Sequence, residues 1–140
     1  MNCPAYAEGV VVSLHVASGG VVGLAAGSRL RALALGPPLH LLADRIPHQD
    51  VASRRFEIVS GLACLGLLAA RRGPFDPVTL GAAASSAPDL EHVVPWLRPG
   101  GRKVFHRGGG RHLGGVPASL QLLLAGATVG FLASTSSGRS

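Results

Sequence analysis

Residues 9–28 read GVVVSLHVASGGVVGLAAGS, an apolar stretch without a formal charge. Gly19, Gly23 and Gly27 recur in it at every fourth position. Residues four apart lie on one face of an α-helix, and glycines on that face let a second helix approach closely. His15 lies one turn before Gly19, on the same face. The pattern therefore predicts a helix whose glycine face, with His15, packs against the interior of the molecule.

Proline and helix-capping residues divide the rest of the chain into further helices. Pro38 suits the first turn of one helix, and Pro47 ends it. Asp50 or Ser53 is a suitable N-cap for the next helix, and Asp76, followed by proline, for the one after. No run alternates with a period of two, so the predicted fold class is all-α, a compact bundle of about five helices. The helices expected after the first cover 38–46, about 51–71, 77 to a break at 88, and 117 to about 133.

Length and composition point to a single membrane-associated domain. We predict one helical domain over 1–133 and a disordered tail over 134–140. The chain is 47% hydrophobic and 14% charged, and its net charge of +6 comes mainly from arginines at the ends of apolar segments. Segments 9–28 and 115–133 each exceed the roughly 18 uncharged residues that a membrane span requires. We therefore expect two spanning helices and a membrane location, while the oligomeric state stays open.

Two other features narrow the class of protein. No aromatic residues alternate with the basic ones, so a platform for stacking nucleic-acid bases is not expected. Cys3 and Cys64 do not have the spacing of metal ligands, and Cys64 lies inside an apolar run. We expect Cys64 to be a small core residue.

The stretch HLLADRIPHQD, residues 40–50, gathers scarce polar side chains in this apolar chain. His40 and Asp44 are four apart, which places both on one face of a helix. His48 and Asp50 follow immediately after Pro47. Neutral imidazole and carboxylate are ligands that zinc, manganese and iron take from proteins. The stretch therefore predicts half of a metal site at a helix break.

A second polar segment repeats the pattern after the fourth predicted helix. In Pro88-Asp89-Leu90-Glu91-His92, the aspartate and the histidine are three apart and share a face if the turn is helical. We expect this pair to converge with His40 and Asp44 on one site. We also expect His15 to contact the 40–50 stretch, through Asp44 or His48, because a partnerless imidazole facing lipid is costly.

Taken in order, His15, the 40–50 stretch, APDLEH at 87–92 and FHRGGGRH at 105–112 resemble the motifs of a known family. The family consists of small membrane-bound proteins described as metal-dependent hydrolases, similar to zinc-dependent phospholipase C. Its pattern is an early His, then H-x-x-x-D-x-x-P-H-x-D, P-D-x-[DE]-H, and H-R-G near a later His. The chain departs from the pattern at Gly110-Arg111-His112-Leu113, where the family often has Thr-His-Ser.

The resemblance implies one or two divalent ions, with zinc favoured, and hydrolysis of a phosphoester, including lipid-derived ones, by metal-activated water. Asp50 or Glu91 would accept the proton from that water. Arg107 would hold a phosphate of the substrate. The implied metal ligands are His15, His40, Asp44, His48, Asp89, His92, His106 and His112, and the resemblance also makes Asp50 a candidate ligand.

Two other classes stay open at this point. One is a non-catalytic membrane protein that binds or senses a divalent metal. The other is a helical scaffold in which the His and Asp pairs form buried hydrogen-bond networks. Asp50 is equally suited to cap a helix. Metal analysis of the purified protein separates the scaffold from the metal-binding classes.

Overall fold

The computed structural model describes residues 11–49, 51, 53–102, 104 and 115–135, and for 92, 93, 95 and 99 only the backbone. Within these residues the fold is all-α, as predicted, and contains no strand. A single isolated bridge pairs His48 with Val116. The helices of ten residues or more are α1 (Val12–Ala26), α2 (Arg29–Ala43), α3 (Arg54–Arg72), α4 (Pro77–Ser86) and α6 (Ala118–Ser134). Short helical turns between α4 and α6 are η1 (Ala87–Asp89), α5 (Leu90–Val93), η2 (Pro95–Leu97) and η3 (Pro99–Gly101).

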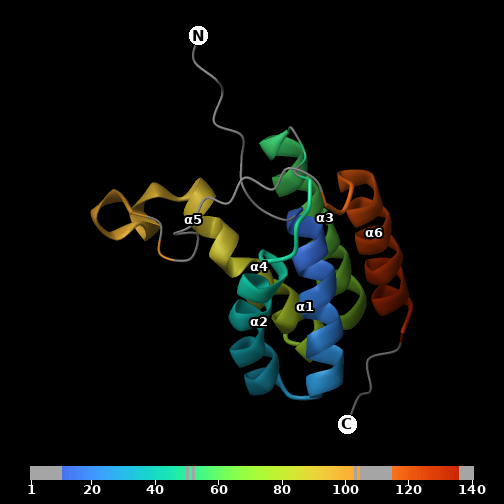
Figure 1. Ribbon diagram of the computed structural model, residues 1–140. Helices are drawn as coiled ribbons and strands as arrows, with labels where there is room; N and C mark the ends of the chain where they lie inside the picture. Colours follow the sequence, from blue (N-terminus) through green and yellow to red (C-terminus); the bar gives the residue numbers. More distant parts are fainter. Residues whose placement is uncertain (1–10, 50, 52, 103, 105–114, 136–140) are drawn as a thin grey trace.

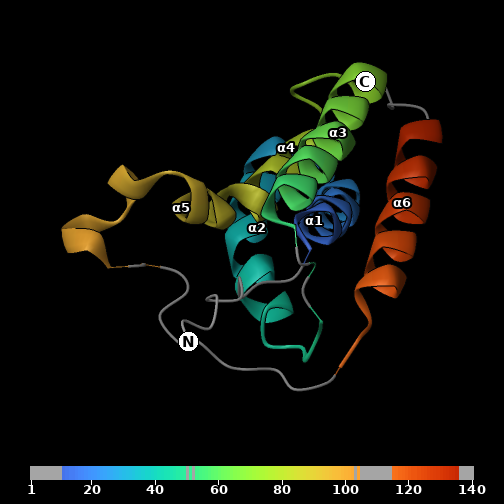
Figure 2. The ribbon, with the colours of Figure 1, turned by 90° about the horizontal axis from the view of Figure 1, so that it is seen from above.

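Helix α1 lies at the centre of the bundle, in contact with α2, α3, α4 and α6 (Figures 1 and 2). The core is built from small and medium side chains, among them Val16, Leu68, Val129 and Leu132. Cys64 packs against this core, as predicted, and burial raises the pKa of its thiol. Removal of these apolar side chains from water is the main stabilising contribution to the bundle.

Glycines set how closely the helices approach one another. A Cβ atom at Gly19 would collide with the carbonyl oxygen of Gly81, and one at Gly23 with the backbone of Pro77. Helix α1 therefore crosses α4 at backbone contact, which confirms the predicted role of these two glycines. Gly27 differs, because it ends α1 as a C-cap with a φ of 60° and a Cβ there would meet nothing within 4 Å. The left-handed conformation, not packing, requires glycine at that position.

The predicted helix over 38–46 is wrong at its N-terminal end, and the observed helix also ends three residues earlier, at Ala43. Helix α2 begins at Arg29 and runs through Pro37 and Pro38. Each proline removes one backbone hydrogen bond to the residue four before it. The two residues that lose their donors, Leu33 and Ala34, are exposed, so water can satisfy their carbonyls.

Capping side chains begin α3 and α4 as the sequence predicts. The Ser53 hydroxyl accepts a hydrogen bond from the Phe56 N–H (3.3 Å), which resolves the predicted choice of cap at α3. The Asp76 carboxylate accepts one from the Val78 N–H (2.9 Å), with Pro77 in the first turn of α4. Such caps satisfy N–H groups that have no partner within the helix.

The two segments predicted to span a bilayer form helices shorter than expected. Segment 9–28 contains α1, with 15 residues, and segment 115–133 contains most of α6, with 17 residues. Across the described ranges, no helix combines the length and apolarity needed to cross a membrane. The structure therefore does not support the two predicted spans. Helix α6 also includes Ser134, the first residue of the predicted tail, and 136–140 lie outside the described residues.

Candidate metal centre

Two histidines from neighbouring helices meet in the interior of the bundle. His15 of α1 and His40 of α2 both have 0% exposure. Their rings stack, with centroids 3.9 Å apart and an interplanar angle of 30°. A glycine lies one turn from each histidine, Gly19 after His15 and Gly36 before His40, and both glycines lie against Ser85 of α4. These two close helix crossings bring the rings together.

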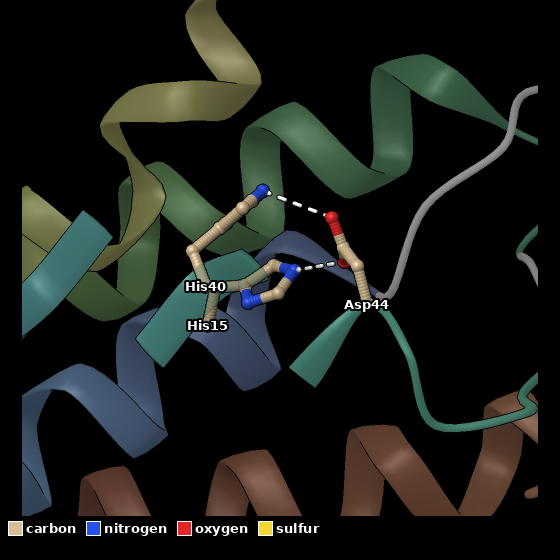
Figure 3. A group of neighbouring side chains, drawn as sticks. All are labelled: His15, His40 and Asp44. Atoms are coloured by element: carbon tan, nitrogen blue, oxygen red, sulfur yellow. Dashed lines mark hydrogen bonds and ion pairs between the residues drawn. The ribbon is translucent and has the colours of Figure 1, made fainter. Parts of the chain in front are cut away.

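Asp44, the C-cap residue of α2, faces both histidines (Figure 3). Its Oδ1 lies 3.1 Å from Nε2 of His15, and its Oδ2 lies 3.1 Å from Nε2 of His40. The first distance confirms the predicted contact of His15 with the 40–50 stretch. One possible ligand atom from each of the three residues lies within 4.8 Å of the other two. Such a group could hold a metal ion.

Asp89 joins the cluster from η1, which lies against α2. Its Oδ1 lies 3.6 Å from Nε2 of His40. This approach confirms that Asp89 converges with His40 and Asp44, although about a third of the chain separates them in sequence. Asp89 contacts the cluster through His40, whereas Asp44 contacts both histidines.

The backbone of α4 decides which nitrogen of His40 faces the carboxylates. Its Nδ1 lies 2.8 Å from the carbonyl oxygen of Ser85. A carbonyl oxygen can only accept, so Nδ1 carries the hydrogen and Nε2 of the neutral ring presents a lone pair. That lone pair faces Asp44 Oδ2 and Asp89 Oδ1. Three electron-rich atoms repel one another unless a positive species, a metal ion or a proton, lies among them.

The cluster is closed on its histidine side and open on its carboxylate side. The histidine side chains are 0% exposed, whereas those of Asp44 and Asp89 are 18% and 14% exposed. A ligand or water molecule would therefore reach the cluster past the carboxylates. Nδ1 of His15 is buried and has no hydrogen-bond partner among the described residues. The described part of the chain thus fixes the tautomer of His40 but not that of His15.

His48, a predicted ligand, lies outside this group. Its side chain is 5% exposed, and its Nδ1 is within hydrogen-bond distance of the Ile46 carbonyl oxygen. Its backbone pairs with Val116 in the isolated bridge. Because this pairing fixes the backbone at His48, the residue lies at the junction between the end of α2 and the start of α6.

Glu91, a predicted proton acceptor, is also not a member of the group. It is 2% exposed, and its Oε2 accepts a hydrogen bond from the Val104 N–H (2.8 Å). The Arg98 Nε donates to the backbone carbonyl of Glu91. These two hydrogen bonds connect Glu91 with the segment that follows α5. The role of Glu91 as a base stays a prediction.

Four predicted site residues lie outside the described residues, namely Asp50, His106, Arg107 and His112. His92 lies in α5, and its side chain is likewise outside the description. The predicted convergence of the four residues is thus confirmed for His40, Asp44 and Asp89, and for His92 it stays a prediction.

Sequence reasoning missed two residues that position the site. Gly36 lets α2 approach α4, because a Cβ there would collide with Ala84 and the Ser85 nitrogen. A signal existed, since an isolated glycine one turn before His40 marks a close packing contact. Ser85 orients His40 through its backbone carbonyl, which any residue type could supply, so its identity carries no signal.

No model of a known protein family matches this chain, and no match was found among curated proteins or solved structures. The resemblance of its four motifs to membrane-bound metal-dependent hydrolases therefore stays a prediction. The candidate site is supported by its own geometry.

Proposed function

We propose that His15, His40 and Asp44 bind one divalent metal ion, with zinc as the favoured metal. Asp89 lies beside the fourth position, which water takes when such a site is catalytic and a fourth protein ligand takes when it is not. The observation that carries the proposal is the lone pair of His40 Nε2, which faces two carboxylates while Nδ1 donates to Ser85. A divalent ion balances the charge of both carboxylates, whereas one proton on His40 balances only one.

The distances between donor atoms support a tetrahedral site. The three that join Nε2 atoms to carboxylate oxygens are 3.1, 3.1 and 3.6 Å. Zinc bonds to nitrogen and oxygen of about 2.0–2.1 Å imply ligand separations of about 3.3 Å in a tetrahedron. The two 3.1 Å distances involve different oxygens of Asp44, and the histidine rings are stacked, so binding one ion would turn the rings and the Asp44 carboxylate toward a common point. The Ser85 carbonyl would supply the outer hydrogen bond that metal-binding histidines usually make.

We propose metal-dependent hydrolysis as the activity. A bound divalent ion would supply Lewis acidity and activate water toward attack on a phosphoester. The open side of the cluster, at Asp44 and Asp89, would admit water and substrate. A phosphoester, including a lipid-derived one, is the substrate class that the family resemblance implies.

Metal binding without catalysis is a second candidate. It is favoured by the environment of Glu91, whose carboxylate accepts the Val104 N–H and which is not a member of the group. Among the described acids, Asp44 and Asp89 are the ones that contact the two histidines, and both would serve as metal ligands.

The test is metal analysis of the full chain and of two variants, each of which replaces one buried histidine. We expect the full chain to bind one equivalent of zinc. His40→Ala should lower the affinity for zinc by more than the roughly 10–100-fold loss that is typical when a residue hydrogen-bonded to a metal ligand is replaced. His48→Ala, buried but outside the group, should retain the metal. Absence of bound divalent ion at neutral pH would leave a proton between His40 and the carboxylates and would reject the proposal.

Hydrolysis is tested on the same proteins with a chromogenic phosphodiester. Asp44→Asn should abolish both metal binding and hydrolysis. Zinc binding with no turnover in the unmodified chain would select the non-catalytic function.

A further inference from the structure

A segment beside the candidate metal centre projects from the bundle. It comprises the described residues 90–102 and 104, from α5 through η3, and is called here the site arm (Figures 1 and 2). Helix α5 contacts mainly the neighbouring turns η1 and η2. The site arm follows Asp89 directly, so it begins at the open side of the cluster.

The site arm exposes large apolar side chains. Trp96, the only tryptophan in the chain, is 87% exposed, and Leu90 and Leu97 are 50% and 46% exposed. Tryptophan is enriched where membranes meet water, since its ring is apolar with one polar N–H. An exposed apolar cluster on a projecting segment is typical of a surface that binds a partner.

The exposed charge on the described part of the site arm is positive. On the site arm Arg102 is exposed, and the acid Glu91 is buried. Every acidic side chain among the described residues is buried or half-buried. Within the part of the chain that the structure describes, the exposed arginines are Arg29, Arg31, Arg45, Arg54, Arg55, Arg71 and Arg102.

We infer that the site arm docks on a lipid bilayer that contains anionic lipids. Trp96 and Leu97 enter the headgroup region, and Arg102 pairs with lipid phosphates. A second copy of the chain is a poorer partner, because two such surfaces would bring arginines against arginines. Nucleic acid is also a poorer partner, because successive bases stack on several aromatic side chains, and on the described site arm Trp96 is flanked by leucines instead.

Docking in this way turns the open side of the cluster toward the bilayer surface. The arm continues from Asp89, whose partly exposed carboxylate lies on that side. The delivery of a lipid phosphoester to the site rests on the proposed function. The docking itself rests only on the exposed tryptophan, leucines and arginines.

The single tryptophan makes the test direct. The purified full chain is mixed with vesicles of equal parts phosphatidylcholine and phosphatidylglycerol, and Trp96 emission and vesicle flotation are measured. We expect emission to shift to shorter wavelength and the protein to float. Binding to pure phosphatidylcholine should be weaker by about tenfold or more, and added salt should weaken binding to the anionic vesicles.

Two exposed leucines provide matched variants. Leu97→Asp on the site arm should reduce flotation about tenfold or more, since it adds a charge where apolar contact with the interface is expected. Leu123→Asp, at a site 68% exposed on α6, should float like the parent. Circular dichroism checks that both variants keep their helices.

Three results would overturn the docking. They are no emission shift with anionic vesicles, an equal loss of flotation in both variants, or a lipid-free shift that grows with protein concentration. The last result would identify a second copy as the partner. Zinc content measured on the same samples separates the two proposals. Zinc-loaded protein that does not float rejects docking alone, and protein that floats without binding zinc rejects the proposed function alone.

Discussion

Helices α1 and α6 are both apolar, and both carry glycines four residues apart, yet the glycines act differently. On α1, Gly19 and Gly23 lie against the backbone of α4 with no room for a Cβ atom. On α6, a Cβ at Gly126 or Gly130 would meet nothing within 4 Å. The same spacing marks a closed helix crossing in one region and an exposed face in the other. The spacing shows which residues share a face but not whether another helix covers it.

The two helices are also held by different forces. Helix α1 is held by packing against four other helices, whereas α6 buries one stripe, formed by Gln121, Ala125, Val129 and Leu132. Polar side chains fasten α6 near both ends. The Gln121 amide donates to the carbonyls of Gln49 (2.8 Å) and Val116 (3.0 Å). The Arg72 Nη1 donates to the Thr135 carbonyl (2.8 Å).

The largest effect is expected at the α1–α4 crossing. Gly19→Ala should lower the free energy of unfolding by about 3 kcal/mol, because the new methyl group meets backbone that cannot move aside. Metal affinity should fall as well, since His15 lies one turn away on the same face. Urea unfolding and zinc titration measure both. A variant as stable as the parent would show that α1 and α4 are not in backbone contact.

A smaller loss is expected where α6 begins. Gln121→Leu keeps the volume but removes the side-chain donor to the Gln49 carbonyl and leaves the buried Val11 N–H without its acceptor, at a cost of about 2 kcal/mol. The control is Gln49→Leu, because Gln49 contributes its backbone carbonyl and its side chain is exposed. Thermal unfolding compares the two, and the control should stay within about 0.5 kcal/mol of the parent. Equal losses would mean that Gln121 does not fasten α6.

Two adjacent arginines test the other end of α6. Arg72 also donates from Nε to Asp76 Oδ1 (3.1 Å), so Arg72→Ala removes several bonds and should cost about 1–2 kcal/mol. Arg71 is exposed, and Arg71→Ala should change stability by less than about 0.5 kcal/mol. Guanidinium denaturation of both variants measures the difference. Comparable values would refute the polar fastening of α6 to α3.

The smallest effect has the opposite sign. Gly126→Ala should stabilise the protein by about 0.5–1 kcal/mol, because alanine favours the helix more than glycine and the site has open space. Differential scanning calorimetry detects the rise in Tm. A loss of stability would show that another surface covers this face of α6, and the contrast between the two glycine pairs would disappear.

Sequence alone predicted much of the local structure. The all-α class, the caps at Ser53 and Asp76, and the glycine face with His15 each depend on residues within one or two helical turns. The His40 and Asp44 pair is equally local, because a spacing of four places both side chains on one helical face. For the same reason, the sequence could identify part of the candidate site before any packing was known.

Tertiary contacts decided the rest. Helix α2 continues through Pro37 and Pro38, although proline usually interrupts a helix. At this point Gly36 packs closely against α4. The Ser85 carbonyl selects the tautomer of His40, and a backbone carbonyl has no sequence signature. The position of Asp89 and the open space at Gly126 are equally non-local. Sequence patterns determine which side chains share a face, and only the three-dimensional packing determines what lies opposite that face.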